Sequence, residues 1–119
     1  MISDIKTGKF GELLALKYLK KVGFVIVEKN WRFGKLEIDL IASLNGELVF
    51  FEIKTRMGNW LSTEENLKIK QIKNLKKAIF LYCSFRKINI ELSRLDFIFI
   101  SLNRKMKVIK AFHYKNILG

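Results

Sequence analysis

The spacing of hydrophobic and polar positions predicts two helices and five strands. The helices are expected at 8–22 and 62–82, and the strands at 24–32, 35–42, 48–55, 95–102 and 106–112. Helical segments repeat apolar residues every three to four positions, whereas the strands are shorter apolar or alternating runs. Since a helix joins two strands in mid-chain, it can serve as a crossover, and we predict an α/β fold with a mixed β-sheet flanked by helices, in the order α-β-β-β-α-β-β.

Turn and cap residues support these boundaries. Gly23 follows the first helix in the position where a terminating glycine is common. Ser62 and Glu65 have the spacing of a capping box at the start of the second helix. Asn45-Gly46 is a strong signal for a tight hairpin between the second and third strands.

The predicted hairpin aligns acidic residues across two strands. A two-residue turn at Asn45-Gly46 places Asp39 opposite Glu52, and it places Glu37 opposite Lys54. Because side chains alternate along a strand, these four residues share one face. Two carboxylates that face each other repel and destabilise the pairing. We therefore expect a compensating cation, supplied by Lys54 or by a divalent metal ion.

The neighbours of these residues leave two interpretations of the acidic face. The opposite face is predicted to be apolar, with Ile38, Leu40, Val49, Phe51 and Ile53. On the acidic face, Ile41, Leu48 and Phe50 favour a partly covered cleft. The alternative is a solvated face on which Glu37 and Lys54 form a cross-strand ion pair.

The first helix adds a third carboxylate. Its apolar arc is predicted to contain Ala15, Leu16, Tyr18, Leu19 and Val22. Glu12 is the charged residue inside this arc, and burial of an unpaired carboxylate costs several kcal/mol. Its partner is expected to be a lysine or the metal ion held by the hairpin carboxylates. Gly8 and Gly11 indicate that this helix approaches another backbone closely.

Composition limits the classes of function. The 119 residues carry a formal net charge of +12. That charge favours a polyanionic partner, although a genome-wide preference for lysine codons is the alternative. One cysteine, Cys83, and one histidine, His113, exclude Cys/His zinc sites. No apolar run has membrane-spanning length, and no secretory signal is recognised. We expect a single domain over residues 1–119, located in the cytoplasm and without a membrane partner.

Two polar features are assigned to structure rather than to chemistry. Asp96 stands two residues after Arg94 and is expected to form a local ion pair with it. His113 is expected to be structural.

Several motifs together resemble a known family. They are Gly8-x-x-Gly11-Glu12-x-x-Ala15, Tyr18-Leu19, Gly23-Phe24, Asn30-x-Arg32, Glu37-Ile38-Asp39-Leu40-Ile41-Ala42 and Leu48-Val49-Phe50-Phe51-Glu52-Ile53-Lys54-x-Arg56. The chain resembles the YraN-like family of uncharacterised bacterial proteins, which is similar to the PD-(D/E)xK nucleases, a superfamily that includes Holliday-junction resolvases and restriction endonucleases. One departure is Leu36, where that family usually has glycine.

The resemblance implies a restriction-endonuclease-like fold and a set of site residues. The acidic residue of the superfamily motif falls on Asp39, its Glu-x-Lys falls on Glu52-Ile53-Lys54, and a helical glutamate falls on Glu12. Asp39, Glu52 and Glu12 would bind Mg²⁺ or Mn²⁺, because these hard cations prefer oxygen ligands. Lys54 would orient the attacking water and stabilise developing charge, and Glu37 is a lesser candidate.

The implied function is hydrolysis of nucleic acid, with DNA, including branched DNA, favoured as substrate. The residues expected to contact nucleic acid are Arg32, Arg56, Lys70 and Gln71. The first alternative is a binding module that keeps the fold without turnover. A second is an electrostatic scaffold for a protein partner, and a homodimer stays open beside a monomer.

Overall fold

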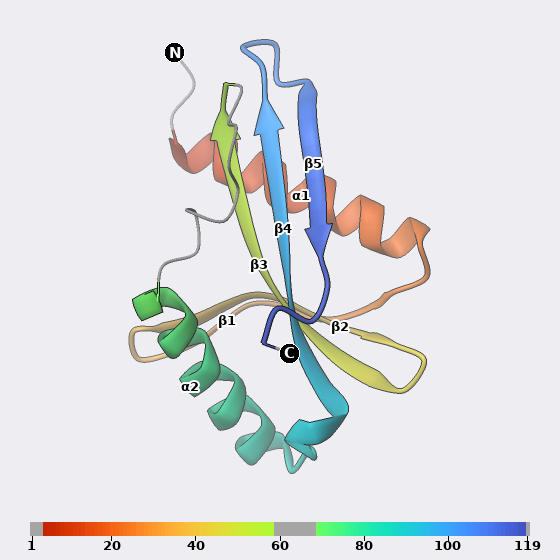
Figure 1. The fold of residues 1–119 in the computed structure, drawn as a ribbon, viewed down its shortest axis with the longest axis vertical. Helices are drawn as coiled ribbons and strands as arrows, with labels where there is room; N and C mark the ends of the chain where they lie inside the picture. Colours follow the sequence, from red (N-terminus) through yellow and green to blue (C-terminus); the bar gives the residue numbers. More distant parts are fainter. Residues whose placement is uncertain (1–3, 59–68, 119) are drawn as a thin grey trace.

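A five-stranded mixed sheet lies between two helices in the computed structural model, which describes residues 4–58 and 69–118 (Figure 1). The elements are α1 (Asp4–Lys21), β1 (Val25–Phe33), β2 (Leu36–Leu44), β3 (Glu47–Met57), α2 (Ile69–Arg86), the 3-10 helix η2 (Ile90–Leu92), β4 (Ser93–Leu102) and β5 (Val108–Tyr114). This order and layering confirm the predicted restriction-endonuclease-like α/β fold. The predicted capping box of the second helix, Ser62 and Glu65, lies outside the described residues.

The strands follow each other across the sheet in the order in which they occur in the chain. Neighbours pair antiparallel except β3 and β4, which are parallel. A parallel pair needs a crossover connection, and α2 lies in the segment that connects β3 to β4. The parallel pair β3–β4 forms the longest ladder of the sheet. Each of these two strands also pairs with a second strand, so their residues are held from both sides.

The β2–β3 hairpin has the predicted turn and register. Asn45 has φ 50° and Gly46 has φ 80°, as a two-residue type I′ turn requires. Pairing continues from Leu44 opposite Glu47 as far as Leu40 opposite Phe51. Beyond that pair the ladder ends, so the predicted cross-strand pair of Asp39 and Glu52 does not form in the ladder, and both acids lie where β2 leaves β3.

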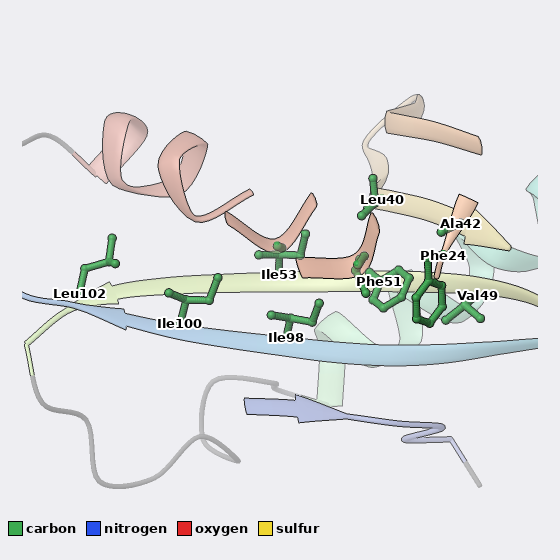
Figure 2. Close-up of a cluster of buried hydrophobic side chains, with 11 residues drawn as sticks. Phe24, Leu40, Ala42, Val49, Phe51, Ile53, Ile98, Ile100 and Leu102 are labelled. Atoms are coloured by element: carbon green, nitrogen blue, oxygen red, sulfur yellow. The ribbon is translucent and has the colours of Figure 1, made fainter. Parts of the chain in front are cut away.

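Each helix covers one face of the sheet with its own hydrophobic cluster. On one face, Ala15 and Leu19 of α1 pack on buried residues of β2, β3 and β4, many of which are labelled in Figure 2. On the other face, α2 packs through Leu75, Ala78, Ile79, Tyr82 and Cys83 against Ile41, Phe50 and Leu95. Figure 1 shows α1 crossing behind β3, β4 and β5, on the side of the sheet opposite to α2.

Two face assignments from the sequence were wrong. Ile38 was predicted to share a face with Leu40, but it packs in the α2-side cluster. The reason is local distortion, since the β1–β2 register shifts between Ile26 and Glu28 and Asn30 has φ 52°. Bulges of this kind increase strand twist and turn side chains away from simple alternation.

The buried face of α1 also differs from the predicted arc. Thr7, Gly11, Ala15 and Leu19 are its buried residues, whereas Tyr18 and Val22 are exposed. The buried residues are small or short along most of this row, and Gly11 lets the helix approach Thr55 of β3 closely, which the apolar pattern alone does not indicate. In the part of the chain that the structure describes, no helix is long and apolar enough to span a bilayer.

Candidate functional site

Asp39 is anchored at the point where β2 and β3 separate. Its Oδ2 atom accepts a hydrogen bond from the backbone N–H of Ile53 at 2.8 Å. This bond takes up a β3 donor just beyond the last paired residues of the hairpin, Leu40 and Phe51. The carboxylate is thereby fixed against the backbone of β3, next to Glu52.

Glu52 is the more buried member of the carboxylate pair, with 9% of its surface exposed. Its Oε2 atom accepts a hydrogen bond from the side-chain amide of Gln71 on α2, at 2.8 Å. Burial, then the hydrogen bond and negative charge of Asp39, raise the pKa of Glu52 to about 9, against the opposing effects of Lys54 and Gln71. The pair is therefore short of positive charge.

Glu12 approaches the same place from α1. The helix contacts β3 closely because Gly11 has no side chain, and a Cβ atom there would overlap the side chain of Thr55. A close approach was predicted at both glycines; at Gly11 it is made to the Thr55 side chain rather than to backbone, and at Gly8 the prediction was wrong, because nothing lies within 4 Å of its Cβ position. Burial raises the pKa of Glu12, the charges of Asp39 and Glu37 raise it further, and Lys9 lowers it.

A pocket of about 290 Å³ connects these residues on the α1 side of the sheet. It is lined by Lys9, Glu12, Leu13, Leu16, Lys29, Asn30, Asp39, Leu40 and Ile53. Glu12 and Asp39 thus share one cavity, while Glu52 lies on the face that contacts α2. Asp39 therefore neighbours both other acids, Glu12 in the pocket and Glu52 at the end of the β2–β3 ladder, but the three do not form one cluster among the described residues.

The carboxylates of Asp39 and Glu52 are the kind of ligand that a hard divalent cation prefers. Asp39 and Glu52 supply oxygen atoms, and burial together with the neighbouring Asp39 raises the pKa of Glu52 despite the charge of Lys54. In residues 4–58 and 69–118, no group of three or more His, Cys, Asp or Glu side chains has the spacing of a complete metal site. Mg²⁺ commonly uses one or two carboxylates together with waters and substrate phosphates.

The remaining predicted site residues divide into two groups. Gln71 contacts Glu52 on the α2 side of the sheet. Arg56 is half-buried and donates a hydrogen bond to the backbone carbonyl of Thr55 at 3.1 Å. Glu37, by contrast, forms an ion pair with Arg32 at 3.4 Å, so the predicted pairing of Glu37 with Lys54 is replaced by one across β1 and β2. Lys70 is exposed at the start of α2 as the structure describes it.

A second polar network was found only in part by sequence reasoning. The expected ion pair between Arg94 and Asp96 is present, with Nε–Oδ1 at 3.0 Å. His113 joins it, because its Nε2 atom is 2.7 Å from Asp96 Oδ2 and its Nδ1 atom is 2.8 Å from the hydroxyl of Tyr18. The predicted structural place of His113 fits this geometry, but its partners lie too far away along the chain for any local pattern to indicate them.

Comparisons with known proteins agree with the motifs. The model of the uncharacterised protein family UPF0102 matches residues 11–100. A UPF0102 protein of Flavobacterium psychrophilum is 39% identical over 106 residues, which cover 88% of each chain. A UPF0102 protein of Christiangramia forsetii is 38% identical, and the match covers 87% of each chain. A UPF0102 protein of Dictyoglomus thermophilum is 34% identical, over 91% of this chain and 92% of the relative. These names state no activity, but the matches extend over nearly the whole chain, which therefore belongs to the family UPF0102, the YraN-like family that its motifs resemble.

Proposed function

We propose that this protein is a divalent-cation-dependent nuclease that hydrolyses phosphodiester bonds of nucleic acid, with DNA, including branched DNA, as the favoured substrate. One observation carries the proposal. Glu52 is buried beside Asp39 at the end of the β2–β3 ladder, and burial, then the hydrogen bond and charge of Asp39, raise the pKa of Glu52 to about 9. A fold that keeps such a costly pair in a motif of Asp followed by Glu-x-Lys fits a role for the pair in binding a cation.

Each residue has a separate task in this proposal. Asp39 and Glu52 would hold Mg²⁺ or Mn²⁺, with Glu12 completing the site through a water. A bound cation would polarise the scissile phosphate and lower the pKa of the attacking water. Gln71 is a positioning residue, because its amide fixes the orientation of the Glu52 carboxylate.

Lys54 provides a positively charged side chain next to Glu52, in addition to any bound metal ion. It stands two residues after Glu52 on β3, so both side chains point to the same face, and its charge lowers the pKa of Glu52. An ammonium group there would orient the attacking water and stabilise the negative charge that develops on the phosphate. Arg56 lies two residues after Lys54, on the same face of β3, and would contact a neighbouring phosphate.

The proposal is tested by a cleavage screen. Duplex, single-stranded, flap and four-way-junction DNA are incubated with the protein in Mg²⁺, in Mn²⁺ and in chelator. We expect cleavage of at least one substrate with either cation and none in chelator. Lys54→Ala should abolish cleavage, whereas Lys17→Ala, which removes an exposed lysine from α1, should leave it unchanged.

A nucleic-acid-binding module without turnover is the second candidate. The observation that favours it is the lack, among the described residues, of a complete three-ligand metal site. In that case binding would depend on the net charge of +12 and fall steeply with salt, while no substrate is cut under any condition. Binding that is equally strong with and without divalent cation, together with the absence of cleavage, would select this candidate.

A further inference from the structure

Two exposed aromatic side chains stand next to each other on β5, at the end of the described sheet. Phe112 is 42% exposed and Tyr114 is 36% exposed. They are two residues apart on one strand, so both point to the same face. The α2-side cluster reaches β4 only at Leu95 and does not include Phe112 or Tyr114.

The strand register places these rings in line with the candidate active site. Glu52 pairs with Phe97, and Phe97 pairs with Tyr114. In the next row, Lys54 pairs with Phe99, which pairs with Phe112. Residues paired across a ladder present their side chains to the same face. Two rows therefore run from the catalytic candidates on β3, through β4, to an exposed ring on β5.

The rings of this face are close to parallel. Phe97 and Tyr114 have ring centroids 6.0 Å apart and an interplanar angle of 19°. Phe112 and Tyr114 are 5.9 Å apart with an angle of 24°. Phe97 is almost fully buried and stacks against Tyr114 from the neighbouring strand. We call Phe97, Phe112 and Tyr114 the aromatic platform.

We propose that the aromatic platform stacks unpaired bases of the nucleic acid whose backbone is held at Glu52 and Lys54. This inference rests on the proposed function and names the class of substrate: single-stranded segments, or strands splayed from a duplex. Neighbouring strands are about 4.8 Å apart, so β5 lies roughly 10 Å from β3. That distance is within reach of one or two nucleotides.

Charge on the same face favours nucleic acid over an apolar partner. The next row of the register contains Arg56, Ser101 and Lys110, so cations stand on β3 and on β5 beside the rings. A single strand offers phosphates and bases at alternating positions, which suits cations interleaved with aromatic rings. Bases in a duplex are stacked on one another and cannot lie on a protein ring.

Binding measurements in chelator separate stacking from phosphate attraction and from cleavage. The probes are a labelled single strand, the duplex of the same sequence, and an abasic strand with the same number of phosphates. Phe112→Leu and Tyr114→Leu should each weaken single-strand binding about fivefold or more. Binding of the abasic strand should stay unchanged, because it has no bases to stack.

Two further variants control for packing. Phe112→Tyr keeps a ring and should keep single-strand affinity. Phe80→Leu removes a ring that is 61% exposed on α2, away from the platform, and should have no effect. If Tyr114→Leu fails to fold, as its melting curve would show, Phe112→Leu provides the test alone, since that ring is the more exposed.

The outcomes distinguish this inference from the proposed function. Equal binding of single and abasic strands by the unmodified protein, or equal losses for both probes in Phe112→Leu, would overturn the platform and leave the nuclease untouched. No binding of any probe would overturn both. A platform variant that converts a dimer to a monomer in sedimentation, without changing strand affinity, would assign this face to a second copy of the chain.

Discussion

Two buried carboxylates on the neighbouring strands β3 and β4 have pKa values shifted in opposite directions. Asp96 on β4 is fully buried and receives hydrogen bonds from Arg94, His113 and the backbone N–H of Asn116. Burial alone would raise the pKa of Asp96, but these partners outweigh it and hold the pKa below its ordinary value. Glu52 on β3 is nearly as buried, yet its described partners are a neutral amide and another carboxylate, and its pKa rises to about 9.

The difference separates a structural acid from a candidate functional one. At Asp96 the negative charge is compensated within the fold, which leaves nothing for a ligand to add. At Glu52 and Asp39 the compensation is incomplete, and an added cation would relieve the repulsion. Burial of an acid is therefore a weak indicator of function, whereas burial together with missing counter-charge is a stronger one.

The largest expected effect is the loss of cleavage in Asp39→Asn. The amide keeps the size and the oxygen that accepts from Ile53, but it removes the charge that would hold the cation. We expect cleavage to fall by roughly a thousandfold or more, measured at saturating substrate. Nucleic-acid binding should persist or tighten, since one negative charge near the phosphates is gone.

Glu91→Gln is the matched control, because Glu91 is an exposed acid on η2. Its cleavage rate should equal that of the unmodified protein. If Asp39→Asn cleaves at the normal rate, the carboxylate pair has no catalytic role. If it unfolds much more easily in chelator, Asp39 is a structural residue like Asp96.

The next effect concerns Asp96→Asn, which should destabilise the fold. Removal of one partner from a buried ion pair costs about 3–5 kcal/mol, seen as a lower urea midpoint. The pH dependence gives an independent check. Since the pKa of Asp96 is lowered, its contribution to stability is complete above the unfolded value and is lost as pH falls through the folded value. The acid arm of the stability curve should therefore be shallower in the variant; an unchanged midpoint and acid arm would show that Asp96 is not a structural anchor.

An effect of opposite sign, confined to alkaline pH, is expected for Glu52→Gln. Between the unfolded pKa near 4.5 and the folded pKa of about 9, the native protein holds a proton that the unfolded chain has lost. Stability of the unmodified protein should therefore fall as pH rises through this interval, by up to about 1.4 kcal/mol per pH unit. The glutamine lacks this slope and should be the more stable protein at alkaline pH in chelator. A variant that is less stable there would mean that the pair is not repulsive.

Much of the fold could be predicted because its determinants are local. Asn45-Gly46 sets the hairpin turn, and the turn sets the register of Asp39 relative to Glu52. The motif spacing brings both acids close together, but the single shared face predicted for them is not found, since Asp39 lines the pocket on the α1 side and Glu52 contacts α2. The face of Ile38 could not be predicted in this way, since it depends on a register shift in the neighbouring strand.

The parts that could not be predicted depend on contacts between distant residues. Tyr18 and His113 are bonded although 95 positions separate them. Gln71 was among the predicted site residues, but its bond to Glu52 could not be predicted, because it depends on how α2 packs on the sheet within the crossover. The pattern of one helix or one strand carries no information on which distant polar group it will meet.

The central claim is that Asp39 and Glu52 bind a divalent cation, and calorimetric titration without substrate tests it most directly. Mn²⁺ and Mg²⁺ are titrated into the protein and into Asp39→Asn at about pH 6 and about pH 8. We predict binding by the unmodified protein, with affinity rising by up to about tenfold per pH unit because the cation displaces the proton of the pair. Asp39→Asn should bind at least tenfold more weakly. Absence of binding by the unmodified protein, or binding of equal strength in Asp39→Asn, would contradict the claim.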